Sequence, residues 1–347
     1  MDNILIIRLS SLGDIIHTLP AFSALREKIP EAKIVWIVEE NGREILDLVP
    51  GIDRIVVAKT RGWKVTSLKS WSEVKLIRKN IRNRDQTAID FQGLVKSGVV
   101  SYLSRAKRRI GFHRKNLKEP ITSIFYTDQL KEISEQTHVI LKNLSLLSLV
   151  GIEEEQFNFP LMIPDALQRT TLKMLEELGY KDSEKLVILN VGAAWATKRW
   201  DPERWVELIR LLKTNRNDLF FLLLWGNEEE KTIADFIHKE TSISKVPFLS
   251  IKDIIALIKE TDLIVSGDTF ALQVACALSR PVVGIFGPTN PKRNGPFSLN
   301  DRIAFHELEC SHCYQRKCST VECLKKITAE EVGGLCLEVL EGCAKRF

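Results

Sequence analysis

The feature that most constrains the fold is an alternation of short apolar runs with amphipathic stretches, which continues along the whole 347-residue chain. The apolar runs are rich in β-branched and aliphatic residues, as strands are, and the stretches between them have helical spacing. Near-continuous apolar runs such as 220–225 are typical of parallel strands covered on both faces. The pattern predicts an α/β protein. We expect strands at 4–9, 33–38, 54–57, 87–91, 185–190, 218–224, 262–266 and 281–286, and helices at 19–29 and 73–83, the latter opened by a capping box at Ser70.

The length predicts two domains, because 347 residues with 44% hydrophobic content are too many for one ordinary α/β domain. An acidic, proline-containing stretch at 153–165 separates the two halves and reads as a linker. Gly13-Asp14 and Gly267-Asp268 each follow a strand and lead into an apolar helix. We therefore expect two Rossmann-like domains, 1–160 and 165–328, whose strand-end turns face one another across a cleft.

The amino-terminal run Ile4–Ile7 is too short for a signal peptide, and no apolar stretch reaches the length that spans a bilayer. These observations predict a cytoplasmic protein whose seven cysteines are mostly reduced. The net charge of +5 is mild and argues only weakly for anionic partners.

Two turns of the first half carry candidate functional residues. Asp14 follows the first strand, where a carboxylate can take a proton from an incoming hydroxyl. The alternative is that Asp14 only caps the next helix. Lys96 stands near a predicted helix start, which is unfavourable for a cation unless an anionic partner is bound. It can equally be a solvent-exposed lysine.

Residues 59–84 concentrate positive charge, with nine basic residues against Glu73 alone, and include Trp63 and Trp71. Basic residues with interfacial aromatics suit an anionic carbohydrate or an anionic membrane face. The alternative is a solvated helix face beside a loop. Because no nucleic-acid-binding motif accompanies the charge, we do not expect a nucleic acid partner.

Four strand-end turns of the second half together predict a nucleotide pocket. Small residues at 192–194 and 196 let a ligand approach the backbone, and Lys198 supplies a cation for a diphosphate. Carboxylates at 228–230 can bind ribose hydroxyls. The turns at 266–269 and 286–291 complete the set, and the G-x-G-x-x-G dinucleotide fingerprint is absent from the chain.

Four cysteines cluster near the end of the chain. Clustered thiolates in a reducing compartment suggest a structural zinc ion, although the spacing is not that of a standard zinc ribbon. Free thiols or a disulfide are the alternatives. The candidate metal ligands are Cys310, Cys313, Cys318 and Cys323.

With these motifs in hand, the chain resembles the bacterial lipopolysaccharide heptosyltransferases (glycosyltransferase family 9), and within them the heptosyltransferase I group. The similarity covers nearly the whole chain. Its most specific parts are the 10–20 opening, the 90–97 block, Arg109-Ile110-Gly111-Phe112 with Glu119-Pro120, Phe125-Tyr126 and His138, and the 286–289 turn.

The resemblance implies a GT-B fold, with the acceptor on the first domain and the donor on the second. It implies ADP-L-glycero-β-D-manno-heptose (ADP-heptose) as donor and Kdo-lipid A as acceptor, at the cytoplasmic face of the inner membrane, with no cofactor required for the chemistry. The carboxyl-terminal helix, about 329–347, is expected to pack back on the first domain. Asp14 corresponds to the catalytic base. The donor-binding residues implied are Lys198, Glu230, Gly267, Asp268, Thr269 and Gln273, and the acceptor-binding residues are Arg8, Ser10, Ser11, Gly13, Arg61, Lys64, Gln92 and Lys96.

The donor turn departs from the pattern of the family. A glycine has become Phe270, and Gln273 replaces a histidine, so that position cannot carry positive charge. Ala193 and Ala194 stand where hydroxyl residues are common. These changes put the donor more in doubt than the reaction type. The alternatives are a related transferase with another sugar nucleotide or the second-heptose acceptor, and a zinc-stabilised, non-catalytic binder of anionic glycan or nucleic acid.

Overall fold

The computed structural model describes residues 2–60, 68–298 and 300–344. The predicted acceptor residues Arg61 and Lys64 lie outside these ranges. The chain divides into two compact units, Met1–Met162 and Ile163–Phe347, and each is described by itself.

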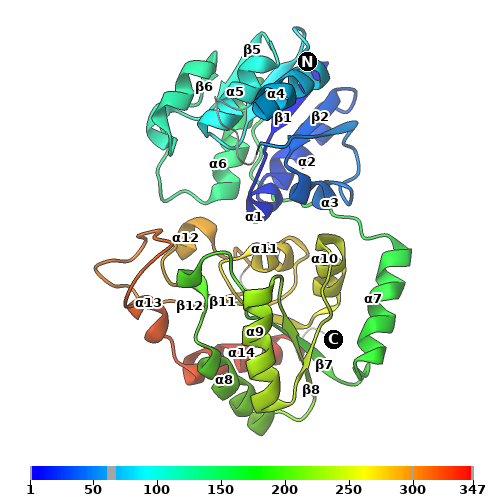
Figure 1. Ribbon diagram of the computed structural model, residues 1–347, viewed down its shortest axis with the longest axis vertical. Coiled ribbons are helices and arrows are strands. Elements are labelled where there is room, and N and C mark those ends of the chain that lie inside the picture. The colour runs from blue at the N-terminus through cyan, green and yellow to red at the C-terminus, as the bar shows by residue number, and fades with distance from the viewer. Residues whose placement is uncertain (1, 61–67, 299, 345–347) are drawn as a thin grey trace. The chain divides into compact units, whose positions relative to one another are not determined.

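Unit 1 is built on a six-stranded sheet with the order β3-β2-β1-β4-β5-β6, in which every neighbouring pair is parallel (Figure 1). Helices connect the strands and cover the sheet. The strands are β1 (Asn3–Ile7), β2 (Lys33–Val38), β3 (Arg54–Val57), β4 (Thr87–Asp90), β5 (Arg108–Gly111) and β6 (Asp128–Gln129). The helices are α1 (Leu12–Ile16), α2 (Leu19–Lys28), α3 (Arg43–Leu46), α4 (Leu68–Ile81), α5 (Val95–Leu103) and α6 (Val139–Ser145), with short 3₁₀ helices at Glu40–Gly42, Arg114–Asn116, Pro120–Phe125 and Leu146–Val150.

Unit 2 repeats this plan with the sheet order β12-β11-β10-β7-β8-β9, again with parallel pairs throughout. The strands are β7 (Lys185–Asn190), β8 (Leu219–Leu224), β9 (Ser244–Lys245), β10 (Leu263–Gly267), β11 (Val282–Ile285) and β12 (Arg302–Ala304). The helices are α7 (Asp165–Glu177), α8 (Pro202–Asn215), α9 (Glu228–Thr241), α10 (Ile251–Glu260), α11 (Phe270–Ala277), α12 (Pro291–Asn294), α13 (Glu322–Lys325) and α14 (Ala329–Ala344), with a 3₁₀ turn at Ala196–Lys198.

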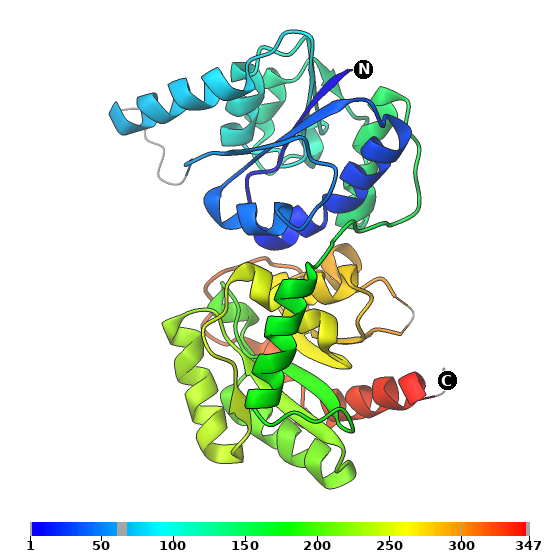
Figure 2. The ribbon, with the colours of Figure 1, turned by 90° about the vertical axis from the view of Figure 1, so that its right-hand side faces the viewer.

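Helix α4 packs on the unit 1 sheet through its carboxyl-terminal part, and its amino-terminal part extends outward, as Figure 2 shows. Its Ile77 and Ile81 are buried in a cluster with Leu5, Ile7 and Val56 from the strands. The helix begins at Leu68, so the expected capping box at Ser70 is wrong: Ser70 lies inside the first turn. Packing of its apolar positions against the sheet stabilises the helix.

Helix α14 contacts α8 and the strands β10, β11 and β12 of unit 2. Its Val332, Cys336 and Leu340 are buried. We expected this helix to pack on the first domain, and the contacts of the described residues 329–344 place it in the core of the second unit.

The predicted α/β class with two Rossmann-like domains is confirmed, because each unit holds one parallel sheet with connecting helices. Strands β2, β3 and β7 have the expected bounds, and other elements differ by one or a few residues. Such shifts at element ends are ordinary, because ends fray.

Candidate functional site

In each unit the strands are parallel, so their carboxyl ends meet at one edge of the sheet. This edge is where open α/β sheets bind ligands. Of the described residues among those predicted for the site, Arg8 to Asp14 follow β1, and Gln92 and Lys96 follow β4. In unit 2, Lys198 follows β7, Gly267 is the last residue of β10, and Asp268 and Thr269 follow it.

Asp14 is held at the start of α1 by the residue that precedes the helix. Its Oδ2 accepts hydrogen bonds from the Ser11 backbone N–H (3.1 Å) and from the Ser11 hydroxyl (2.8 Å). Its Oδ1 lies 3.8 Å from the Arg8 guanidinium, and 40% of the side chain is exposed. Asp14 therefore caps the helix with one oxygen and leaves the other beside a cation and open to a ligand.

The ionisation of Asp14 is set by opposing effects. Partial burial raises the pKa, and the charges of Arg8 and His17 with the two Ser11 hydrogen bonds lower it by more, so the net pKa lies below its ordinary value of 3.8. The carboxylate is therefore ionised at neutral pH, which is the state that can accept a proton.

Arg8 is buried with its Nε donating to the Thr18 hydroxyl (3.1 Å), and that hydroxyl donates to the Asp14 carbonyl (2.8 Å). The side-chain amide of Asn143, on α6, donates to the His17 carbonyl (2.9 Å). These bonds tie α1 to α6 and fix the direction of the guanidinium toward Asp14.

The turn after β4 is organised by Asp90, which is fully buried. Its carboxylate accepts from the backbone N–H groups of Gln92 and Gly93 and from the hydroxyls of Ser97 and Tyr126, at 2.8 to 3.1 Å. Burial raises the pKa of Asp90, although these bonds oppose that effect. The carboxylate is thus structural, and it shapes the loop that presents Gln92.

Gln92 links the two turns of the site. Its Oε1 accepts from the Leu9 and Ser10 backbone N–H groups, at 2.7 and 3.3 Å. Its Nε2 is buried and has no hydrogen-bond partner within the described ranges. A buried amide donor without a partner is costly, so a ligand oxygen would bind well there.

Lys96 is engaged by a residue that the sequence analysis missed. Its Nζ lies 2.8 Å from Glu39 Oε1 and 3.5 Å from the Ser10 hydroxyl. Glu39 is buried and also accepts from the Thr60 hydroxyl. Glu39 comes directly after the predicted strand 33–38, so the strand-end rule that singled out Asp14 applies to it as well.

In unit 2, Lys198 and Asp268 form a nearly buried ion pair. Lys198 Nζ lies 2.7 Å from Asp268 Oδ2 and 3.1 Å from the Asp268 carbonyl, with side-chain exposures of 15% and 9%. A Cβ at Gly267 would lie 2.9 Å from the Lys198 carbonyl, so this approach of the two turns needs glycine.

Thr269 is fixed beneath that pair. Its hydroxyl lies 3.0 Å from both Asn190 Nδ2 and the Ser266 hydroxyl. Asn190 ends β7 and Ser266 belongs to β10, so these bonds join adjacent strands at the edge.

Glu230, in the first turn of α9, is buried against two glycines. Its Oε2 accepts from the Gly226 backbone N–H at 2.7 Å. Gly192 lies so close that a Cβ there would come within 2.2 Å of the carboxyl group. The carboxylate thus stands between the ends of β7 and β8, where a hydroxyl-bearing ligand can reach its second oxygen.

Replacing Gly192 by alanine is expected to displace the Glu230 carboxylate and to lower the melting temperature of unit 2 by roughly 5 to 10 °C. Losing a hydrogen bond to a charged group costs about 1.5–3 kcal/mol, and about 1 kcal/mol shifts a unit of this size by a few degrees. Differential scanning calorimetry measures the shift. Gly334→Ala is the control, because its Cβ meets open space. Equal melting temperatures for both variants would contradict the close contact between Gly192 and the Glu230 carboxyl group.

Gln273 is buried in α11, and its Nε2 donates to the Asn294 carbonyl at 2.8 Å. The side chain therefore joins α11 to α12. It supplies no positive charge to the edge of the sheet.

The structure does not support the expected zinc site. Cys310, Cys313 and Cys318 are exposed, Cys323 is half-buried, and all four are free thiols. They line a space of about 30 Å³, but among the described residues no three potential ligands are placed to hold a metal ion. Hydrogen bonds from the backbone N–H groups of Val321 and Thr320 lower the pKa of Cys318, and burial raises that of Cys323.

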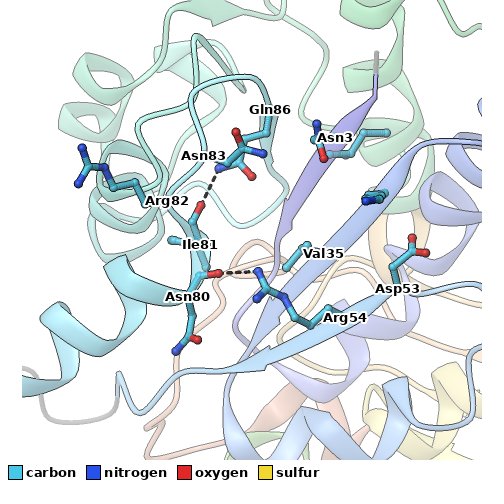
Figure 3. A pocket seen from close by; sticks show the side chains of 11 residues that line it. Asn3, Val35, Asp53, Arg54, Asn80, Ile81, Arg82, Asn83 and Gln86 are labelled. Atoms are coloured by element: carbon cyan, nitrogen blue, oxygen red, sulfur yellow. Dashed lines mark hydrogen bonds between the residues drawn. The ribbon is translucent and has the colours of Figure 1, made fainter.

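A larger cavity of about 300 Å³ lies at the opposite, amino edge of the unit 1 sheet (Figure 3). Two of the charged groups that line it are engaged within the protein: Asp53 accepts from Arg26 and from the Ile34 N–H, and Arg54 donates to the Asn80 carbonyl. The site predicted from the sequence lies at the other end of the same strands, so this cavity is not part of it.

No helix in the described part of the chain combines the length and apolar character needed to cross a membrane.

Comparison with known proteins places this geometry in a family. A family model described as glycosyltransferase family 9 (heptosyltransferase) matches residues 74–324. Lipopolysaccharide heptosyltransferase 1 of Escherichia coli K12 is 28% identical over 310 residues, which cover 86% of this chain and 92% of that protein.

Solved structures support the same family assignment. The E. coli heptosyltransferase WaaC, solved with ADP, superposes with a TM-score of 0.77 at 25% identity, covering 97% of this chain and 99% of that one. A family 9 glycosyl transferase from Veillonella parvula has a TM-score of 0.81 at 19% identity, covering 98% and 97%, and supports the fold alone. The GT-B fold class is thereby confirmed. Because the family model matches well over half of the chain, the protein belongs to glycosyltransferase family 9 and is an enzyme of the heptosyltransferase type.

Proposed function

We propose that the protein transfers a heptose from ADP-L-glycero-β-D-manno-heptose to a Kdo sugar of Kdo-lipid A, with inversion at the anomeric carbon. The observation that carries this proposal is the carboxylate of Asp14, fixed at the carboxyl edge of unit 1 with one oxygen unused by Ser11. The relatives named lipopolysaccharide heptosyltransferase 1 support the sugar and the pathway. WaaC, solved with ADP and with ADP-2-deoxy-2-fluoro heptose, supports the donor.

The proposed reaction is a single displacement. The acceptor hydroxyl gives its proton to Asp14 as its oxygen attacks the anomeric carbon. The bond from that carbon to the β-phosphate oxygen breaks, and ADP leaves with the electron pair. No cofactor is needed to balance this step, because base, nucleophile and leaving group account for every proton and electron.

The donor roles follow from the contacts in unit 2. Lys198 would balance the charge of the departing diphosphate, since a preorganised cation stabilises charge that develops in the transition state. The Glu230 carboxylate, held by Gly226, would accept from ribose hydroxyls. Gly267, Asp268, Thr269 and Gln273 would shape the turn around the sugar and diphosphate.

The acceptor roles are assigned to the edge of unit 1. Lys96, beside Ser10, would bind an acidic group of the acceptor, since an ammonium donates charge-assisted hydrogen bonds to carboxylates and phosphates. Gln92 would add its unpartnered amide donor, and Arg8 and Gly13 would shape the turn that holds Asp14. Arg61 and Lys64, from the basic stretch, are proposed to contact the anionic acceptor as well.

A mass-spectrometric assay tests the function with purified protein, Kdo-lipid A and ADP-heptose, and with other sugar nucleotides in parallel. A mass gain of one heptose is expected. Transfer only from another donor would support the same mechanism and would indicate that Phe270 and Gln273 change the donor specificity. No transfer from any donor, or to any core acceptor, would contradict the proposal.

We further propose that the protein binds peripherally to the cytoplasmic face of the inner membrane through α4. Helix α4 carries Lys75 and Lys79 in solvent, with Leu76 beside them at 52% exposure, and Arg82, directly after the last residue of the helix, is exposed as well. Lys75 and Lys79 are four positions apart on one side of the helix, and the Arg82 backbone N–H still donates to the Arg78 carbonyl, so we expect the three cations to present one basic surface.

Replacing Lys75, Lys79 and Arg82 by serine is expected to weaken binding to anionic phospholipid vesicles roughly a hundredfold, at about 1 kcal/mol for each cation near the surface. Vesicle co-sedimentation measures the change. The matched control removes the same charge from exposed positions of unit 2, with Lys173, Lys213 and Lys239 changed to serine. Equal losses for the two triple variants would assign the binding to net charge and contradict a role for α4.

A further inference from the structure

The segment that contains the cysteine cluster is fixed to the candidate donor edge of unit 2. The Tyr314 backbone N–H donates to the Pro288 carbonyl at 3.0 Å, and the Asn290 N–H donates to the Tyr314 hydroxyl at 3.3 Å. The Thr197 hydroxyl donates to the Gln315 carbonyl at 2.7 Å. Residues 314–315 are therefore tied both to the turn after β7 and to the turn after β11.

The next residue, Arg316, lies over an aromatic ring at that edge. Its guanidinium carbon is 5.0 Å from the centre of the Trp195 ring. Lys198 Nζ lies 4.5 Å from the centre of the same ring. The Trp195 ring thus contacts two cations beside the turn predicted to bind the diphosphate.

The two cations differ in their partners. Lys198 is paired with Asp268 at 2.7 Å, so much of its charge is balanced within the protein. Arg316 is exposed, and within the described ranges no carboxylate is paired with it. Arg316 therefore adds a positive charge beside Trp195 that no carboxylate of the described residues balances.

The contact with the ring leaves the guanidinium able to bind a second group. A cation over an indole ring is attracted through the ring face. Arginine carries its five N–H donors in its own plane and can donate two of them to one phosphate. Trp195 can thus position Arg316 while its N–H donors stay available to a phosphate.

We propose that Arg316 is a diphosphate-binding residue of the donor site, positioned by Trp195 and supplied by the cysteine-rich segment. This rests on the proposed function, because it requires that a nucleoside diphosphate bind at this edge. The role of the segment 310–323 is then to bring a cation over the donor edge.

Titration calorimetry with ADP and with adenosine tests the assignment. Arg316→Met is expected to raise the Kd for ADP about tenfold, since a charge-assisted hydrogen bond contributes about 1.5 kcal/mol or more. The Kd for adenosine, which has no phosphate, should change less than about twofold. Lys317→Met is the matched control, because it removes the neighbouring exposed charge without the stacked position.

Trp195→Leu is a second test, because it leaves Arg316 in place and removes the ring that positions it. The Kd for ADP should rise, although less than in Arg316→Met, and a weaker salt dependence of ADP binding should accompany both changes. An unchanged melting temperature shows that the variants are folded. Equal ADP affinities for Arg316→Met and Lys317→Met would overturn the inference while ADP binding by the wild type stands. Absence of ADP binding by the wild type would overturn the donor proposal itself, and the inference with it.

Discussion

Asp14→Asn is expected to lower kcat for heptosyl transfer by a factor of about 10² to 10⁴, the usual contribution of a general base. Asparagine keeps an oxygen that can accept from the Ser11 N–H and hydroxyl, so the start of α1 should be preserved. What it loses is the ability to take a proton from the acceptor. Single-turnover mass spectrometry with saturating donor and acceptor measures the change.

Two controls separate catalysis from folding. Asp14→Asn should bind ADP as the wild type does, because Asp14 belongs to unit 1 and the proposed donor residues belong to unit 2. Ser11→Ala removes one hydrogen bond to Asp14 and keeps the carboxylate, so its kcat should fall less than about tenfold. Full activity of Asp14→Asn would show that another group is the base.

The pH dependence follows from the sign of the pKa shift. Because the folded pKa of Asp14 lies below 3.8, the carboxylate is ionised throughout the neutral and mildly acidic range. Its contribution to activity and stability is present above pH 3.8 and is lost as the pH falls through the folded pKa. A kcat/KM profile that loses half its value between pH 5 and 7 must therefore reflect a different group.

Lys198→Met is expected to weaken ADP binding and to lower kcat/KM by about a hundredfold. Truncating one partner of a buried charge pair costs about 2–5 kcal/mol, largely because the other charge is left unpaired. Here the remaining charge would be Asp268, whose side chain is 9% exposed and which would also repel the diphosphate. Calorimetry with ADP and initial rates measure the two losses.

The double variant Lys198→Met/Asp268→Asn distinguishes the two causes. If the unpaired Asp268 carboxylate accounts for much of the loss of ADP affinity, the double variant should bind ADP more tightly than Lys198→Met alone. Lys213→Met, an exposed lysine that donates to the Thr241 carbonyl, should behave as the wild type. ADP affinity in Lys198→Met within twofold of the wild type would remove Lys198 from the donor site.

The sequence was sufficient for the fold class and the family. Apolar runs with strand length predicted β2 and β7 with their observed bounds, because a strand buried on both faces must be apolar throughout. The helix start at Ser70 was wrong, because α4 depends on Ile77 and Ile81 reaching the sheet, which is a tertiary contact. The clustering of the four cysteines suggested a metal ion, and the folded segment leaves three of them exposed.

The sequence also indicated which turns carry polar residues, since a turn that follows a buried strand is visible in the pattern. It did not show which turns meet. The ion pair of Glu39 with Lys96 joins the residue after β2 to the first turn of α5, and the Trp195 ring contacts Arg316 across more than a hundred positions of the chain. These contacts between distant turns depend on the strand orders β3-β2-β1-β4 and β11-β10-β7-β8. All parallel strands share the same local periodicity, so their order is decided only when the helices pack on the sheet and the chain closes its core.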